Sequence, residues 1–382
     1  VWTGSEYAVA WEYRVLAEGW KVLLLRLDPD GHRIGGETIV MPAVTVGGYP
    51  SLEWTGSGFG LVRVVQSSGE IFFAELDELG NPVSAPIIVV DDAPDYSHAD
   101  PQLVWTGSEF GLVWHVYHSA ETYTGVYFKT LSTEGMALSP QLRVSTGYGE
   151  LDRDPHLAWT GSQFGVAWND DTDGYVKNYF TTIDASVIVG TPVQLSSTNA
   201  SVSPPSLTWN GSAFGVTWTD LRHGWSEIYF TRIDCCDDAD GDSYTECGED
   251  TNDGDPAVNP DRLEFCDAQD NDSDGTTDEL CDGICDEAEQ WSSEERLTDN
   301  YGTSGGTDLA WNGSGYGLTF HDDRSEETNV YFVELDSSLN KLSGDIKITT
   351  LAGISANPSI VWTGTEYGLA WRDSRDGNYE IY

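Results

Sequence analysis

A short phrase that begins with tryptophan occurs seven times along this chain of 382 residues. Each copy reads Trp, then Thr or Asn, then Gly, then Ser or Thr, and an aromatic residue with a short apolar run follows it. The copies begin at Trp2, Trp54, Trp105, Trp159, Trp209, Trp311 and Trp362. Their spacing is about fifty residues, except for a doubled gap between Trp209 and Trp311. A repeat of this period is typical of arrays of similar units, so we expect one closed array.

The fifth copy shows the pattern inside one unit. Apolar runs at 206–209 and 214–218 flank Asn210-Gly-Ser, and an Asn-Gly pair in this setting predicts a tight β-hairpin whose two turn residues both adopt positive φ. A third run follows at 227–233. Across the chain the first three strands recur seven times and a short fourth strand six times. Four short antiparallel strands per repeat predict an all-β fold, a seven-bladed β-propeller with almost no helix.

The charge of the chain is strongly negative. It has 64 acidic residues against 18 Lys and Arg, a formal net charge of -46. Such a surface repels nucleic acids and anionic membranes and favours cations and basic partners. Most of these carboxylates are expected to form a solvated surface. No apolar run approaches the roughly eighteen residues that a membrane-spanning helix needs, so no such span is expected.

The doubled gap predicts an insertion inside the fifth blade. We expect blades one to five, without the last strand of blade five, in residues 1–234, an insert in 235–290, and the remaining propeller in 291–382. All six cysteines fall in the insert: Cys235, Cys236, Cys247, Cys266, Cys281 and Cys285. An even number of cysteines in a segment without an apolar core predicts disulfides, whose pairing the sequence leaves open. A zinc site is the alternative, but the insert contains no His. Disulfides predict a secreted or cell-surface protein.

The insert is also the most acidic part of the chain. Residues 235–287 contain 20 Asp and Glu and one Arg, so they are expected to fold only when cations neutralise them. Two stretches place acids at positions 1, 3 and 5 of a calcium loop, starting at Asp270 and Asp238. Position 12 after Asp270 is Cys281, so Asp278 or Glu279 must complete that shell. The candidate metal ligands are Asp238, Asp240, Asp242, Tyr244, Glu249, Asp250, Asp253, Asp255, Asp270, Asp272, Asp274, Thr276, Asp278 and Glu279.

The insert resembles a known family of metal-binding repeats. The segments that carry the resemblance are Asp250-Thr-Asn-Asp-Gly-Asp-Pro256, Glu264-Phe-Cys266-Asp and Asp270-Asn-Asp-Ser-Asp-Gly275. They look like the MopE-type repeat of bacterial surface and secreted proteins, which is similar to thrombospondin type 3 calcium repeats. The resemblance covers about residues 237 to 282, and Thr251 and Ser273 stand where the family has cysteines. The family name is linked with copper, but oxygen ligands favour calcium, so we expect two or more Ca²⁺ ions. The blades resemble secreted bacterial propeller repeats of no single activity.

Two groups of loops offer candidate ligand-binding residues. Polar clusters precede the third and fourth blades, and they depart most from the repeat: His98 and Asp100, then Asp154 and His156. These four are the candidate ligand-binding residues. The loops after the second strands repeat a partial motif, Asp220-Leu-Arg222, Asp323-Arg324 and Asp373-Ser-Arg375. Its recurrence favours a turn-stabilising role over ligand binding.

The sequence contains no recognisable catalytic phrase, and no catalytic residue is assigned. The leading hypothesis is therefore an extracellular, calcium-binding propeller that acts as a binding module for a glycan, a surface or a protein ligand. A polysaccharide hydrolase or lyase is an alternative hypothesis, and it predicts that His98, Asp100, Asp154 and His156 converge on one pocket. A structural spacer in a larger surface protein is a further alternative.

Overall fold

A computed structural model of the chain describes most residues outside the predicted insert. The described residues are 1–16, 18–65, 68–91, 96–118, 123–145, 153–172, 174–184, 187, 189–234, 294–299, 301–325, 327–350 and 353–382. Within them every regular element is a β-strand, and no helix long and apolar enough to cross a membrane is found. The predicted cysteines and metal ligands between Cys235 and Cys285 lie outside the described residues.

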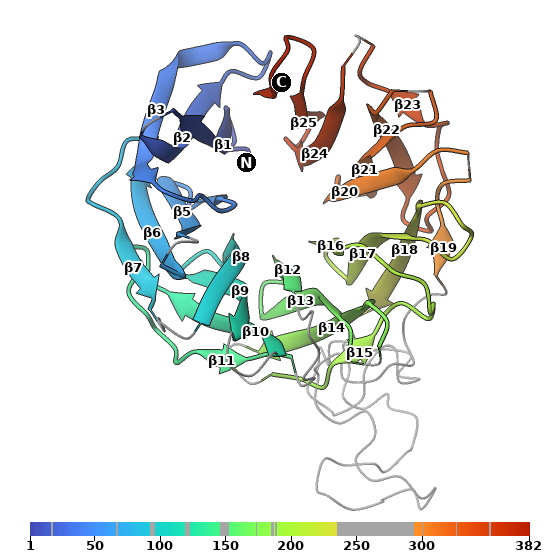
Figure 1. Ribbon diagram of the computed structural model, residues 1–382, viewed down its shortest axis with the longest axis horizontal. Helices are drawn as coiled ribbons and strands as arrows, with labels where there is room; N and C mark the ends of the chain where they lie inside the picture. The colour runs from blue at the N-terminus through green and yellow to red at the C-terminus, as the bar shows by residue number, and fades with distance from the viewer. Residues whose placement is uncertain are drawn as a thin grey trace, which may run out of the picture.

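The strands form seven separate antiparallel sheets, arranged as blades around a central channel (Figure 1). Blade one contains β1 (Tyr7–Val15), β2 (Gly19–Leu27) and β3 (Arg33–Val44). Blade two contains β4 (Ser51–Trp54), β5 (Gly58–Val65), β6 (Glu70–Asp77) and β7 (Ile87–Val90). Blade three contains β8 (Tyr96–Trp105), β9 (Phe110–His118), β10 (Tyr123–Leu131) and β11 (Leu142–Arg143). Blade four contains β12 (Arg153–Trp159), β13 (Gln163–Asp170), β14 (Lys177–Asp184) and β15 (Val193–Gln194). Blade five contains β16 (Ser206–Trp209), β17 (Ala213–Asp220), β18 (Glu227–Asp234) and β19 (Glu295–Arg296). Blade six contains β20 (Ser304–Trp311), β21 (Gly315–Asp322), β22 (Asn329–Asp336) and β23 (Ile346–Lys347). Blade seven contains β24 (Ser355–Trp362), β25 (Tyr367–Asp373) and β26 (Glu380–Ile381).

The predicted seven-bladed propeller is confirmed. Blades two to six have four strands each, in sequence order from the channel outwards. In blade one the first strand is reduced to a bridge between Trp2 and Tyr7, and β24, β25 and β26 are the strands of blade seven. In blade five, β19 pairs with β18 although residues 235–293 separate them in sequence.

The tryptophan phrase forms the hairpin between the first two strands of each blade, but the turn differs from the prediction. In the blade-three turn Gly107 has a φ of 101°, whereas no Thr or Asn of the seven phrases has a positive φ. The Thr106 hydroxyl instead accepts the N–H of Glu109 at 3.0 Å and donates to the Glu109 carbonyl at 2.9 Å. Asn210 caps its turn similarly, accepting the N–H of Ala213 at 2.7 Å. Thr and Asn therefore replace each other in the phrase because either side chain can close the same turn.

The aromatic residues of the phrase hold neighbouring blades together. Within a blade, Trp159 packs on Phe164 with ring centroids 4.4 Å apart, and the other six phrases repeat this contact. The same Phe164 also packs against Phe128 of blade three, at 4.9 Å. Each aromatic therefore belongs to its own hairpin and to the interface with the preceding blade.

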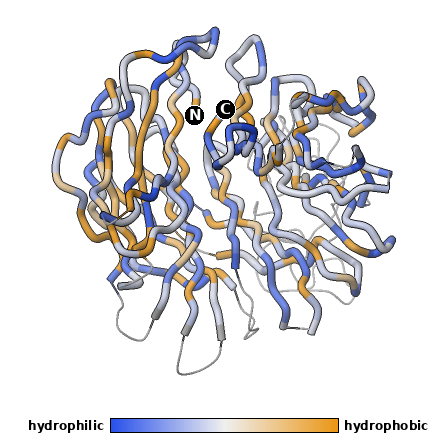
Figure 2. Tube along the Cα trace, turned by 45° about the horizontal axis from the view of Figure 1, so that its top comes forward, coloured by the Kyte–Doolittle hydropathy of each residue, from blue (hydrophilic) through white to orange (hydrophobic). Residues whose placement is uncertain are grey.

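The hydrophobic core lies between adjacent sheets rather than in one central mass. Its largest members are the second tryptophans, Trp114, Trp168 and Trp218, which are at most 1% exposed. Most apolar segments lie in the strands, and many polar segments lie in the connecting loops (Figure 2). The first and last blades meet where the ring of Tyr7 covers Gly368, so the array closes on itself.

Candidate functional site

The innermost strands of four blades carry a β-bulge near the mouth of the channel. The register with the second strand shifts once in each of β8, β12, β20 and β24. At each bulge one residue has a positive φ: Asp100 (45°), Asp154 (51°), Gly306 (56°) and Asn357 (51°). Asp and Asn tolerate this conformation better than other residues with side chains, which explains their occurrence here. The bulge takes the side chains of Asp100 and Asp154 out of the regular alternation of the strand.

The two aspartates of this set, Asp100 and Asp154, meet at the junction of blades three and four. His115 of β9 lies between them, with its Nδ1 atom 3.2 Å from Oδ2 of Asp100. The backbone N–H of Asp154 donates to the same Nδ1 atom at 3.4 Å. One donor atom from each of the three side chains lies within 4.8 Å of the other two. We call Asp100, His115 and Asp154 the mouth cluster.

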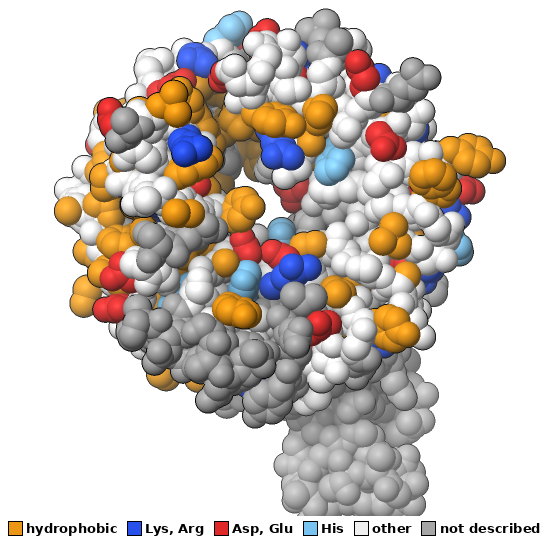
Figure 3. Space-filling model, viewed as in Figure 1, with side chains coloured by type: hydrophobic (Ala, Val, Ile, Leu, Met, Phe, Trp, Pro, Cys, Tyr) orange, Lys and Arg blue, Asp and Glu red, His pale blue; other side chains and the backbone are white. Residues whose placement is uncertain are grey.

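The mouth cluster is partly open to solvent. The side chains of His115, Asp100 and Asp154 are 13%, 21% and 30% exposed. Arg153 borders the cluster, with Nε 3.4 Å from Oδ2 of Asp154. Figure 3 shows acidic, basic and histidine side chains gathered beside the channel, over β8 and β12.

The two carboxyl groups of the mouth cluster differ in acidity. Burial raises the pKa of Asp154 to about 6, and the hydrogen bond and the negative charge of Asp100 act in the same direction. Burial alone would also raise the pKa of Asp100, but the hydrogen bond and charge of His115 lower it. Near neutral pH Asp100 is therefore more completely ionised than Asp154.

The structure brings together some of the residues predicted from sequence and not others. All four lie within strands β8 and β12 and not in the loops expected from the sequence. Asp100 and Asp154 meet, and His156 of β12 is close enough for the charges of Asp100 and Asp308 to act on it. Burial lowers the pKa of His156 in spite of these charges. His98 points elsewhere: its ring is 1% exposed, contacts Trp114 edge-on, and its Nδ1 is hydrogen-bonded to the carbonyl of Gly69.

Sequence reasoning missed His115, although a signal was present. The residue stands five positions after the hairpin aromatic, in Phe110-Gly-Leu-Val-Trp-His115, and the sixth blade repeats this in Tyr316-Gly-Leu-Thr-Phe-His321. In blade three this fifth position lies in the second strand, β9, where His115 pairs with Ala99 of β8. An alignment of the blades would have marked both histidines.

Further acidic groups lie on the first strands of other blades. Asp308 of β20 accepts hydrogen bonds from Ser206 Oγ at 3.2 Å and from the backbone N–H of Ile360 at 2.9 Å. Asp308 therefore links the first strands of blades five, six and seven. Burial raises the pKa of Glu53 of β4 to about 7.

The Asp-Arg motif of the loops after the second strands stabilises those turns, as its recurrence favours. Arg222 forms ion pairs with Asp220 at 2.5 Å and with Glu294 of the outer strand segment, and it covers the ring of Tyr229 at 4.2 Å. Arg324 repeats the arrangement, but its partner is Asp322 at 2.8 Å and not Asp323. Asp323 instead accepts the backbone N–H of Thr303. The motif is therefore Asp-x-Arg in all three blades.

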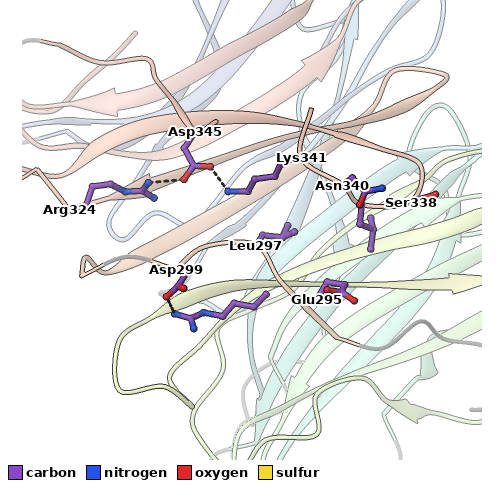
Figure 4. A pocket seen from close by; sticks show the side chains of 10 residues that line it. Glu295, Leu297, Asp299, Arg324, Ser338, Asn340, Lys341 and Asp345 are labelled. Atoms are coloured by element: carbon purple, nitrogen blue, oxygen red, sulfur yellow. Dashed lines mark hydrogen bonds and ion pairs between the residues drawn. The ribbon is translucent and has the colours of Figure 1, made fainter. Parts of the chain in front are cut away.

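A pocket of about 500 Å³ lies at the outer rim, between blades five and six (Figure 4). Its cationic side chains already pair with carboxylates: Arg324 and Lys341 with Asp345, and Arg296 with Asp299. These ion pairs neutralise the cationic side chains that line the pocket, so they do not mark it as a site for an anionic ligand.

Comparisons with known proteins support the fold alone. No protein-family model and no curated protein sequence matches the chain. Acylaminoacyl peptidase of Pyrococcus horikoshii is similar over 99% of this chain, with a TM-score of 0.53 and 10% identity. Acylaminoacyl peptidase in complex with Z-Gly-Gly-Phe-chloromethyl ketone has a TM-score of 0.52 and 10% identity over 99% of this chain. TolB from Acinetobacter baumannii has a TM-score of 0.41 and 13% identity, over 99% of this chain and 79% of TolB. The chain spans about half, 49%, of either peptidase, so the likeness carries no activity over.

Proposed function

We propose that this protein is a secreted, calcium-binding β-propeller that acts as a binding module, with its ligand site at the channel mouth. The observation that carries the proposal is the mouth cluster, in which two blades contribute carboxylates around one imidazole. Binding sites commonly use a few polar groups that a rigid scaffold holds in place, and here the strands β8, β9 and β12 hold them. The proposed calcium sites rest on the sequence of the insert.

The chemistry of the mouth cluster favours a glycan as the ligand. Carboxylates and an imidazole nitrogen accept hydrogen bonds, and sugar hydroxyls donate them. Arg153 adds a donor at the edge of the site, with its side chain 44% exposed. A mixed set of acceptors and one donor suits a neutral polyhydroxylated ligand better than an anionic one.

A glycan array tests this proposal. The full chain is applied at millimolar calcium together with Asp100→Asn/Asp154→Asn and a control, Asp28→Asn/Asp30→Asn. The control removes two acidic groups of an exposed turn that also contains His32, far from the blade-three junction in sequence. We expect the first variant to lose at least tenfold in apparent affinity and the control to bind as the native chain does. Equal binding by both variants, or no glycan bound by the native chain, contradicts the proposal.

A second candidate function is hydrolysis of a polysaccharide. The observation that favours it is the pair of neighbouring carboxyl groups with different acidity, because one could act as general acid and the other as base. Release of reducing ends from a panel of polysaccharides tests it. Turnover that disappears in Asp154→Asn supports hydrolysis, and absence of turnover on the whole panel refutes it for those substrates.

A further inference from the structure

The junction between blades three and four has a structural counterpart between blades six and seven. His321 corresponds to His115, and its Nδ1 atom likewise accepts a backbone N–H from the bulge of the next blade, that of Asn357 at 3.4 Å. The bulge positions of Asp100 and Asp154 correspond to Gly306 and Asn357. The fold therefore builds this junction with its histidine and without any carboxylate at the two bulges.

The carboxylates of the mouth cluster create an electrostatic conflict that the counterpart lacks. A nitrogen that accepts a backbone N–H presents its lone pair, and Nδ1 of His115 does so toward Asp154. Oδ2 of Asp100 lies 3.2 Å from the same nitrogen. One positive charge between the two atoms is therefore needed: either a proton on Nδ1, which makes the hydrogen bond to Asp100 described above, or a cation that both atoms bind.

The distances of the mouth cluster suit a cation. Ligand atoms at about 2.0 to 2.2 Å from one metal lie roughly 3 to 3.5 Å apart. The pair formed by His115 and Asp100 already has this separation, at 3.2 Å. The third donor atom, from Asp154, lies within 4.8 Å of both, so a side-chain movement completes the set. The metal would take the lone pair of Nδ1 and so replace the 3.4 Å contact with the N–H of Asp154.

We infer that Asp100, His115 and Asp154 bind one divalent transition-metal cation such as Zn²⁺. Imidazole nitrogen with two carboxylate oxygens is a donor set that suits zinc, whereas calcium prefers six to eight oxygens. The three residues leave a coordination position for a ligand oxygen. The inference rests on the proposed function, because it assigns the cation to the same ligand site. The net charge of -46 favours the approach of cations.

The neighbouring Arg153 is compatible with this assignment. It approaches Oδ2 of Asp154, which leaves the other carboxylate oxygen for the metal. The cation would add a second positive charge beside the carboxylate pair, which otherwise has Arg153 at the edge of the cluster.

Zinc binding by the full chain tests the inference directly. The chain is stripped with a chelator, saturated with Ca²⁺ without reductant, and dialysed against Zn²⁺, and bound zinc is measured by elemental analysis. We expect His115→Gln and Asp100→Asn/Asp154→Asn each to bind one zinc per chain fewer than the native protein. The control, His321→Gln, removes the matching histidine and should bind as much zinc as the native chain.

Thermal melting without zinc shows whether each variant is folded. If His115→Gln does not fold, Asp154→Asn replaces it, because Asn357 already occupies the corresponding bulge. Equal zinc content in the native chain and in the folded mouth-cluster variants overturns the inference. An equal loss in His321→Gln overturns it as well, since zinc would then bind scattered imidazoles.

The glycan array separates this inference from the proposed function. Glycan binding by the native chain that is lost in the mouth-cluster variants, without any zinc bound there, supports the site and refutes the cation. One zinc lost in these variants with glycan binding unchanged supports the cation and refutes the glycan site.

Discussion

Single side chains close the hairpins of this protein. The residue after each phrase tryptophan is always Thr or Asn, and its side-chain oxygen accepts the backbone N–H groups that the turn leaves unpaired. A buried or partly buried N–H group without a partner costs free energy, so this position contributes to stability in every blade. The same residue types that mark the turn in the sequence therefore also explain its stability.

Replacing Thr106 tests this capping. Thr106→Ala removes the acceptor for the N–H groups of Ser108 and Glu109 and the donor to the Glu109 carbonyl. We expect a decrease of about 1 kcal/mol in the free energy of unfolding, measured by calorimetry. Thr106→Asn is the matched control and should retain most of the stability, because Asn caps two other blades. Unchanged stability of Thr106→Ala would show that the hydroxyl does not stabilise the turn, and equal destabilisation by Ala and Asn would show that Asn cannot replace it.

The half-buried carboxyl group of Glu53 should make stability depend on pH. Burial raises its pKa from an ordinary value of 4.5 to about 7, so the folded state binds this proton more tightly than the unfolded state. The stability that this tighter proton binding gives is fully present below pH 4.5. It is lost as the pH rises through 7 and is absent above that pH. We expect Glu53→Gln to be more stable than the native chain at pH 8, by up to about 3 kcal/mol, with little difference at pH 4.5. A difference in melting temperature that does not vary with pH contradicts this assignment.

At the scale of elements, the joint between blades depends on a glycine in the second strand of blades two to seven. A methyl group added at Gly165 would lie 2.5 Å from the ring of Phe214 in the next blade, and Gly111 and Gly215 stand in the same relation to Phe164 and Tyr316. The glycine of one blade thus receives the hairpin aromatic of the next. This contact explains the Gly after each hairpin aromatic in blades two to seven.

Gly165→Ala tests the joint. The added methyl group forces the ring of Phe214 out of place, and overpacking of this kind costs about 1 to 3 kcal/mol. Gly344→Ala is the control, because nothing lies within 4 Å of the added atom and its φ is not positive. We expect a clear decrease in melting temperature for Gly165→Ala alone. Similar melting of the two variants would mean that the blades can separate slightly without loss of stability.

For the whole molecule, the propeller and the acidic insert are expected to respond differently to metal removal. The blades are held by apolar contacts between neighbouring sheets, whereas the sequence of the insert predicts folding that requires calcium. Propeller and insert should therefore behave as separate units in a chelator.

Chelation in the absence of reductant checks this expectation. With EDTA, residues 237–282 should become more sensitive to proteolysis while the far-UV circular dichroism of the strands stays unchanged. Mass spectrometry of the fragments locates the cleavage sites. Cooperative melting of the whole protein on chelation would instead place a structural calcium ion in the propeller.

The sequence by itself determined the number of blades, the hairpin in each, and the count of fourth strands. These features follow from residues close together in the chain, since turn chemistry and apolar alternation are local properties. It also indicated the Asp-x-Arg turns, although only the structure showed that Asp322, one residue earlier than expected, pairs with Arg324.

The mouth cluster was decided by the tertiary structure. Asp100 and Asp154 are 54 residues apart, and they meet because bulges in β8 and β12 turn both towards the junction of two blades. His115 completes the cluster from a second strand, while His98 turns towards Gly69. Bulge position and blade packing set these directions, and both depend on contacts between residues far apart in the chain.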